Sequence, residues 1–206
     1  MSQFFHIHPD NPQGRLINQA VQIVQQGGVI VYPTDSGYAI GCALGEKKAM
    51  EKIIQIRGLG RNHNFTLMCK DLSEIANFAR VDNSAFRTIR SLTPGPYTFI
   101  FKGTKEVPKR VLNEKKKTIG IRVPDNNIAQ ALLEELGEPL MSSTLLLPGG
   151  EFAESDPDDI RLQLEKLVDL IIHGGYLGET PTTVVDFSEG EPELIRVGEG
   201  DPSLFE

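Results

Sequence analysis

Arginine and hydroxyl side chains gather in six short clusters, each at the end of a predicted strand or helix. The clusters are Thr34/Ser36/Tyr38, Arg57/Arg61/His63, Arg122, Ser142/Ser143/Thr144, Thr182/Thr183 and Arg196. Guanidinium groups beside hydroxyls are the parts from which phosphate and carboxylate sites are assembled. For one arginine alone, a surface ion pair worth about 0–1 kcal/mol is the simpler explanation. For the whole set, convergence at one end of a sheet is the better interpretation, and it predicts an anion-binding site.

Residues 29–41 contain the cluster most like a ligand-binding turn. Residues 29–32 form a β-branched run after two glycines, which predicts a buried strand. We expect Pro33 to end that strand, because proline has no N–H to donate to a neighbouring strand. Polar side chains then follow at Thr34, Asp35, Ser36 and Tyr38. Open α/β sheets place ligands past the carboxyl end of a core strand, but a polar turn without a ligand explains the segment equally well.

Common catalytic and metal-binding templates do not match this chain. Residues 58–63 begin like a dinucleotide-binding motif, but the third glycine is absent and the segment follows a helix. The chain has no P-loop sequence and no Gly-x-Ser-x-Gly elbow. Cys42 and Cys69 are too isolated for the usual zinc patterns, and His6 and His8 lack a third ligand. Nothing in the sequence brings a serine, a histidine and an aspartate together as a hydrolase would require, so we expect no resident metal and no such triad.

Strands alternate with helices over most of the chain, which predicts a single α/β domain over residues 1–206 with a mixed sheet. Helices are predicted at residues 16–24, 49–57, 71–80, 84–92, 128–136 and 156–168. Strands are predicted at residues 29–32, 66–69, 97–101, 118–123, 139–144, 169–172, 182–187 and 194–197. Asp71 with Glu74 reads as a capping box, and Asp125 and Asp156 as helix N-caps. Residues 147–157 are expected to form a surface loop, without a repeat or a linker elsewhere.

The net charge of −7 is unevenly distributed. Residues 151–206 carry 15 acids and 3 bases, a net −12, which leaves +5 for residues 1–150. A basic run consists of Lys102, Lys105, Lys109, Arg110, Lys115, Lys116 and Lys117, opposed only by Glu106 and Glu114. Such a run can attract RNA phosphates even on an acidic protein, because salt confines its field to about 8–10 Å. For any one of these residues, a solvated loop side chain is the simpler interpretation.

The composition is that of an ordinary globular protein, with 39% apolar and 24% charged residues. No apolar run approaches the roughly 20 residues that a membrane span needs. The first residues have neither the basic nor the apolar part of a signal peptide, and two separated cysteines suit a reducing compartment. We therefore expect a cytoplasmic protein that has no membrane partner.

Five motifs, in order, resemble those of the YrdC-like family of threonylcarbamoyl-AMP synthases, and the best match is its shorter branch. Residues 33–41 (PTDSGYAIG) resemble the family's PTDTVYGLG, and residues 94–98 (PGPYT) match its PGPYT. Residues 118–124 (TIGIRVP) are similar to TVGVRVP, residues 182–186 (TTVVD) to STVVD, and residues 195–198 (IRVG) to LRxG. Each motif is weak alone, but together they cover a core of about residues 15–200.

The resemblance implies a twisted mixed parallel/antiparallel sheet that is flanked by helices and has a concave basic face, the YrdC-like fold. It also implies a reaction in which threonine and bicarbonate form a carbamate that attacks the α-phosphorus of ATP, usually with Mg²⁺. Threonylcarbamoyl-AMP and pyrophosphate result, and partner enzymes transfer the group to adenosine in tRNA. Positioning and charge neutralisation carry such a displacement, so we expect no catalytic nucleophile.

Site residues follow from the resemblance position by position. It implies that Thr34, Tyr38 and Arg122 hold the amino acid, with Arg122 on its carboxylate. It implies that Arg57, where the family has a lysine, faces the phosphates together with Arg61. It implies that Ser142, Thr144, Thr182 and Arg196 contact the nucleotide.

Two motifs depart from the family pattern. The basic motif K-x-R-P reads RGLGRNH at residues 57–63, and the loop T-S-A-N-x-S-G reads STLLLPG at residues 143–149, so an expected asparagine is Leu146. Losing one such hydrogen bond costs ~1–3 kcal/mol, which weakens nucleotide binding.

Three functions therefore stay open. The first is a threonylcarbamoyl-AMP synthase of weak or divergent activity. The second is a non-catalytic protein that binds double-stranded RNA or tRNA through the concave face and the basic run. The third is a paralogue that acts on another nucleotide or small molecule, for which the apolar residues 145–147 are the main support.

Overall fold

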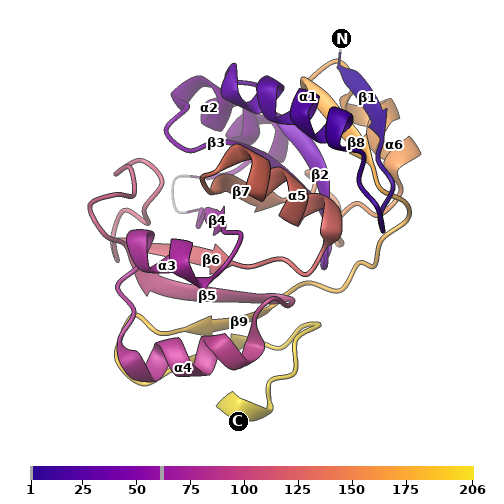
Figure 1. Cartoon of the computed structure of the whole chain (residues 1–206). Helices are drawn as coiled ribbons and strands as arrows, with labels where there is room; N and C mark the ends of the chain where they lie inside the picture. The colour runs from indigo at the N-terminus through magenta and orange to yellow at the C-terminus, as the bar shows by residue number, and fades with distance from the viewer. Residues whose placement is uncertain (1, 61–62) are drawn as a thin grey trace.

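The computed structural model describes residues 2–60 and 63–206. Within them, ten strands form one mixed sheet in the order β1-β8-β2-β3-β7-β4-β6-β5-β9-β10 (Figure 1). The strands are β1 (Gln3–His6), β2 (Ile30–Thr34), β3 (Gly37–Ala43), β4 (Thr66–Met68), β5 (Tyr97–Lys102), β6 (Thr118–Arg122), β7 (Leu140–Thr144), β8 (Leu170–His173), β9 (Thr183–Asp186) and β10 (Glu193–Arg196). The helices are α1 (Gly14–Gln25), α2 (Lys47–Arg57), α3 (Leu72–Phe78), α4 (Asn83–Leu92), α5 (Asn127–Leu136) and α6 (Pro157–Leu164), with a 3₁₀ turn at Ser203–Phe205. The predicted mixed α/β class is confirmed.

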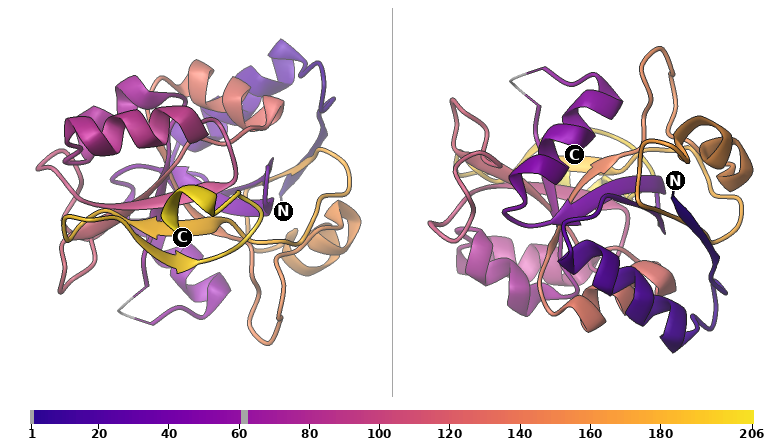
Figure 2. Two further views of the ribbon diagram at one scale, coloured as in Figure 1. Left: turned by 90° about the horizontal axis from the view of Figure 1, so that it is seen from below. Right: turned by 90° about the horizontal axis from the view of Figure 1, so that it is seen from above.

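Helices cover both faces of the sheet (Figure 2). Helices α1 and α5 lie on one side, and α2 and α6 lie on the other. The alternation of side chains along β2 explains this arrangement, because successive residues of a strand face opposite ways. Ile30 and Tyr32 join the apolar cluster under α1 and α5, whereas Val29 and Val31 join the cluster that includes α2 and α6. A strand buried on both faces must be apolar throughout, as residues 29–32 are.

The prediction that Pro33 ends the first core strand is wrong. Strand β2 continues to Thr34 and forms an antiparallel hairpin with β3, in which Pro33 is paired with Tyr38. The parallel ladder with β8 stops at Val31, so at Pro33 the strand has no neighbour on that side. Proline is tolerated there because its missing N–H removes no bond to a neighbour. The polar turn is thus a hairpin tip at Asp35 and Ser36, not a loop that leads away from the sheet.

Strand β3 was not predicted, because its four glycine or alanine positions and its place after a polar turn hide the strand pattern. It lies between β2 and β7 and is buried along its whole length. Gly41 is needed in that position, since an added Cβ would lie 3.1 Å from Met141 O and 3.1 Å from the Tyr32 ring. Strand β1, which pairs in parallel with β8, was also missed.

Helix α5 begins one residue later than the predicted cap. Asn126, not Asp125, is its N-cap, and its Oδ1 accepts from Ile128 N and Ala129 N, both at 3.0 Å. The backbone N–H of Asp125 instead donates to Asp35 Oδ2 at 2.8 Å. The capping of α5 and the anchoring of the β2–β3 hairpin therefore use adjacent residues.

Two helix ends and one capping contact also differ from the prediction. Helix α6 ends at Leu164 instead of residue 168. Helix α3 ends at Phe78 instead of residue 80, because Ala79 turns extended and bridges to Gly103. Asp71 caps α3 as predicted, but Glu74 Oε1 accepts from Lys70 N at 3.0 Å instead of completing the capping box. No helix among the described residues is long and apolar enough to cross a membrane.

The cap assignment predicts a difference between two neighbouring substitutions. Asn126→Ala should lower the free energy of unfolding by about 1 kcal/mol, because two N–H groups of the first turn lose their acceptor. Asp125→Ala should cost much less, since only its backbone N–H is used. Urea denaturation of both variants measures this difference. An equal or larger loss for Asp125→Ala would contradict the assignment.

Candidate anion-binding site

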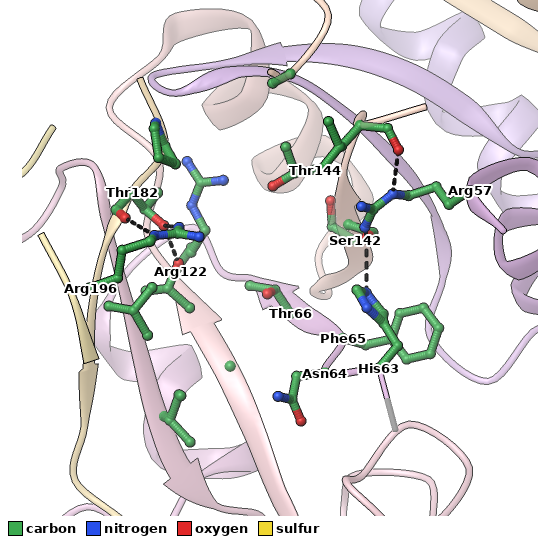
Figure 3. Close-up of a pocket in the computed structure, with 18 of the residues that line it drawn as sticks. Arg57, His63, Asn64, Phe65, Thr66, Arg122, Ser142, Thr144, Thr182 and Arg196 are labelled. Carbon is green, nitrogen blue, oxygen red and sulfur yellow. Dashed lines mark hydrogen bonds between the residues drawn. The ribbon is translucent and has the colours of Figure 1, made fainter. Parts of the chain in front are cut away.

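A cavity of about 730 Å³ opens between the central strands and the loops that follow β7 and precede β9. Six of the residues predicted for the site line it: Arg57, Arg122, Ser142, Thr144, Thr182 and Arg196. Figure 3 shows Arg122, Thr182 and Arg196 on one wall and Arg57, His63 and Ser142 on the opposite wall. The predicted convergence of distant clusters on one hollow is therefore present, and its volume lies in the range of small-molecule pockets.

Three predicted residues do not line this cavity in the described part of the chain. Thr34 lies behind the wall, where its Oγ1 donates to Gly37 O at 2.6 Å and lies 3.5 Å from Arg122 Nη2. Tyr38 Oη donates to Gly175 O at 2.7 Å, and burial raises the pKa of this phenol to about 12. Arg61 lies outside the described residues. The substrate contacts expected for these three side chains stay predictions.

Arg122 is the most buried of the site's cations. Its Nη2 donates to Asp35 Oδ1 at 2.7 Å, and the two side chains are only 5% and 9% exposed. The other oxygen of Asp35 accepts from Asp125 N. Arg122 Nε is buried and has no hydrogen-bond partner among the described residues. An unpaired buried donor costs free energy.

Arg196 lies on the same wall and is held without a carboxylate. Its Nε donates to Thr182 O at 3.0 Å and its Nη2 to Thr182 Oγ1 at 3.1 Å (Figure 3). Thr182 is positioned in turn by a 2.7 Å hydrogen bond to Thr98 Oγ1. Burial, and then the positive charge of Arg122, lower the pKa of Arg196. Two guanidinium groups that repel each other across this wall favour an anion between them.

The opposite wall is built from the end of α2, the segment before β4 and strand β7. Arg57 Nε donates to Leu146 O at 3.0 Å, and its Nη1 donates to Ser143 Oγ. His63 Nε2 lies 3.1 Å from the same Ser143 Oγ. Burial lowers the pKa of Arg57, and burial and then the charge of Arg57 lower the pKa of His63 to about 4. In the part of the chain that the structure describes, this wall therefore offers the cation of Arg57 beside a neutral imidazole.

Sequence reasoning grouped His63 and Ser143 with the polar clusters but assigned them no role. The available signal was the position of His63 six residues after Arg57, in the lengthened basic motif. Thr66 and Thr98 also line the cavity and were not predicted, because each is one hydroxyl in an otherwise apolar strand. Among the described residues, no three His, Cys, Asp or Glu side chains cluster as metal ligands do.

Two hydroxyls of the site are used differently. Ser142 Oγ is bonded to Tyr32 Oη at 2.6 Å, and the serine is 1% exposed. Thr144 ends β7 and is exposed, so its hydroxyl is the more accessible of the two predicted nucleotide contacts.

The basic run lies in β5 and in the loop between β5 and β6. Lys105, Lys109, Arg110, Lys115, Lys116 and Lys117 are exposed, and Lys102 is half-buried. Asn113 organises the turn, because its Oδ1 accepts from Lys115 N and Lys116 N at 3.1 and 3.0 Å. Asn113 Nδ2 donates to Asn64 Oδ1 at 2.8 Å, and Asn64 lines the cavity. The basic turn is thus attached to the wall that carries His63.

Comparison with protein families agrees with this geometry. The model of the Sua5, YciO and YrdC proteins, described as "Telomere recombination", matches residues 22–198. The chain belongs to this family. The resemblance found in the sequence motifs is thereby confirmed, over most of the core for which it was expected.

Two relatives within the family differ in how similar their sequences are to this chain. It is 66% identical to YciO of Escherichia coli (strain K12) over 205 residues, which is 100% of both chains. It is 32% identical to the threonylcarbamoyl-AMP synthase of Coxiella burnetii (strain RSA 493) over 178 residues, or 85% of this chain and 94% of that protein.

Solved structures give the same picture of the fold. The crystal structure of E. coli YciO superposes with a TM-score of 0.97 and covers 100% of both chains. The crystal structure of P. abyssi Sua5 complexed with L-threonine superposes with a TM-score of 0.88 at 20% identity, over 96% of this chain and 58% of that one. At that identity the likeness concerns the fold alone, and it confirms the predicted YrdC-like fold.

The buried Arg122–Asp35 pair predicts a large effect on stability. Asp35→Ala should lower the free energy of unfolding by about 3 kcal/mol, because it leaves a buried guanidinium unpaired. Glu165→Ala removes the exposed partner of Arg161 and should cost at most about 1 kcal/mol. Chemical denaturation of the two variants compares them. Equal losses would show that the buried pair does not hold the hairpin tip.

Proposed function

We propose that this protein is an ATP-dependent synthase that makes threonylcarbamoyl-AMP or a close analogue for the modification of adenosine in tRNA, in the cytoplasm. The observation that carries the proposal is the pair of cationic walls that face each other across one cavity. A substrate set with a carboxylate at one end and phosphates at the other matches this arrangement. The threonylcarbamoyl-AMP synthase relative and the Sua5 structure solved with L-threonine support the same choice of ligands.

The Arg122 wall suits the amino acid. A carboxylate accepts well from guanidinium N–H groups, and Arg122 keeps Nη1 and the unpartnered Nε for this purpose. Asp35 balances part of the charge of Arg122, so the Arg122 side chain suits a single carboxylate rather than a polyphosphate. Thr34 stands behind Arg122 and supports its position.

The Arg57 wall suits the phosphates. Among the described residues, the hydrogen-bond partners of Arg57 are a carbonyl and a hydroxyl, which leave its positive charge uncancelled. Arg196, likewise held by neutral oxygens of Thr182, faces the nucleotide from the other side. Thr144 offers an exposed hydroxyl between them (Figure 3). Mg²⁺ enters as part of the MgATP substrate, because it binds mainly phosphate oxygens and water.

The chemistry needs no protein nucleophile. The amine of threonine adds to bicarbonate and water leaves, which gives a carbamate. A carbamate oxygen then attacks the α-phosphorus of ATP, the bond from that phosphorus to the β-phosphate oxygen breaks, and pyrophosphate departs. Both anionic reactants must be brought together, and the guanidinium groups lower the repulsion between them.

The remodelled loop after β7 predicts weak nucleotide binding. Where the family pattern has asparagine, Leu146 presents an apolar side chain to the cavity, and its backbone N–H and carbonyl are already bonded to Thr144 O and Arg57 Nε. Loss of an amide contact to the nucleotide costs ~1–3 kcal/mol, or about 5–150-fold in affinity.

Threonine-dependent pyrophosphate release tests the proposal. Purified protein with threonine, bicarbonate and MgATP should release pyrophosphate only when threonine is present. Arg57→Gln and Arg122→Gln should each lower kcat/KM by about 10–100-fold, because each removes charge-assisted hydrogen bonds. Arg87→Gln, at an exposed position of α4, is the matched control and should keep full activity.

Two outcomes of this assay are informative. No release at high enzyme concentration would reject the synthase. Release supported by another amino acid or nucleotide would favour the paralogue with a different small substrate. Thermal melting of each variant separates lost activity from lost folding.

RNA binding is a second candidate function, favoured by the attachment of the basic turn to the cavity wall through Asn113 and Asn64. A turn whose backbone is fixed can present Lys115 and Lys116 to the phosphates of double-stranded RNA or tRNA without a large loss of entropy. Such binding is dominated by phosphate contacts and falls steeply with salt.

Neutralising that turn should weaken RNA binding and its salt dependence. Lys115→Ala/Lys116→Ala should reduce the slope of log K against log salt by about 2 for duplex RNA, roughly one per lysine. Lys47→Ala/Lys48→Ala, at exposed positions of α2, is the control of equal charge change. Lys117 is left intact, because its φ of 57° is a left-handed conformation whose replacement would disturb the turn. Equal slopes for the two double variants would contradict the assignment.

A further inference from the structure

Ser143 lies at the centre of a network on the phosphate wall. Its Oγ is contacted by Arg57 Nη1 and lies 3.1 Å from His63 Nε2 (Figure 3). Ser143 is only 5% exposed, and Arg57, His63 and Ser143 all line the cavity. The three residues come from α2, the segment before β4, and β7, so the network ties three parts of the chain together.

The direction of each hydrogen bond follows from donor and acceptor capacity. A guanidinium can only donate, so Arg57 donates to Ser143 Oγ. The serine proton then needs an acceptor, and the closest candidate in the network is His63 Nε2. That arrangement requires a neutral imidazole with its proton on Nδ1. The lowered pKa of His63, caused by burial and then by the charge of Arg57, agrees with a neutral ring at pH 7.

The ring of His63 is itself held in place. It packs edge-on against Phe65 at a centroid distance of 5.0 Å. Phe65, which directly precedes β4, is 4% exposed and belongs to the hydrophobic core. A fixed imidazole fixes the rotation of the serine hydroxyl, and the hydroxyl fixes one edge of the guanidinium. Leu146 O holds the Nε of Arg57. The remaining N–H groups of Arg57 are then aimed at the cavity.

We propose that His63 is a positioning residue for polyphosphate binding, which acts through Ser143 to orient Arg57. This inference rests on the proposed function, since it assigns Arg57 to the phosphates. His63 itself contributes an acceptor and no charge. In the described part of this wall, the network orients the guanidinium of Arg57, at the position where the family motif has a lysine.

Binding of inorganic tripolyphosphate, measured by isothermal titration calorimetry, tests this role without any need for turnover. His63→Leu should weaken the dissociation constant by about 10-fold, because the serine hydroxyl loses its acceptor. His63→Gln should stay within about threefold of the unsubstituted protein, since its side-chain carbonyl can accept from Ser143. His8→Ala, at an exposed histidine far along the chain, is the control and should bind normally.

A double-substitution cycle shows whether His63 acts through Ser143. Ser143→Ala alone should weaken binding about 10-fold, and His63→Leu/Ser143→Ala should be no weaker than either single variant. Losses that multiply would overturn the proposal, because they would mean that His63 contacts the phosphates directly. Unchanged binding by His63→Leu would also overturn it.

A measurement on the unsubstituted protein covers the case in which His63→Leu does not fold. The ¹⁵N shifts of His63 at pH 7 should show an unprotonated Nε2 and a protonated Nδ1. The opposite tautomer, or an imidazolium, would overturn the proposal. If the unsubstituted protein binds no tripolyphosphate, the phosphate assignment of the proposed function fails as well. If the unsubstituted protein binds tripolyphosphate and the His63→Leu variant binds it equally well, the positioning role fails while the phosphate assignment stands.

Discussion

The ion pair between Arg122 and Asp35 is the interaction on which the site depends. Strands β7 and β4 lie between β3 and β6 in the sheet, so the tip of the β2–β3 hairpin must reach across two strands to meet the end of β6. The second oxygen of Asp35 takes the N–H of Asp125, which leads into α5. One carboxylate thus joins a hairpin, a central strand and a helix start. Such a buried pair brings little net stability, but removing one partner destabilises the protein strongly. The main effect of the pair is therefore to fix the positions of the three segments that it joins.

The other two cations are anchored in a different way. Arg57 and Arg196 are held by carbonyl and hydroxyl oxygens, and burial lowers the pKa of both. Neutral anchors fix a guanidinium without cancelling its charge, so the field of the cavity stays positive. The positive charge of Arg122 also lowers the pKa of Arg196, so these two like charges repel each other.

The departures from the family motifs lie together on the wall of the cavity that carries Arg57. The lysine of the family motif is Arg57, the asparagine position is Leu146, and the lengthened segment supplies His63. In the folded chain the three are linked, because Leu146 gives its carbonyl to Arg57 and His63 shares Ser143 with it. A planar guanidinium needs more partners to hold its orientation than a lysine ammonium does. Here those partners are the backbone carbonyl of Leu146 and the hydroxyl of Ser143, which in turn contacts the imidazole of His63.

The alternation of strands and helices and the family motifs could be predicted from the residues alone, because periodicity and turn chemistry are local properties. Arg57, Arg122 and Arg196 were singled out in this way, and the cavity brings them together. The folded chain was needed to see that Pro33 lies inside a hairpin, that the hydroxyl of Tyr38 donates to Gly175 O, and that His63 lies against Ser143. Those contacts join residues 80 or more positions apart in two of the three cases. They depend on the order of strands in the sheet, which a local pattern does not encode.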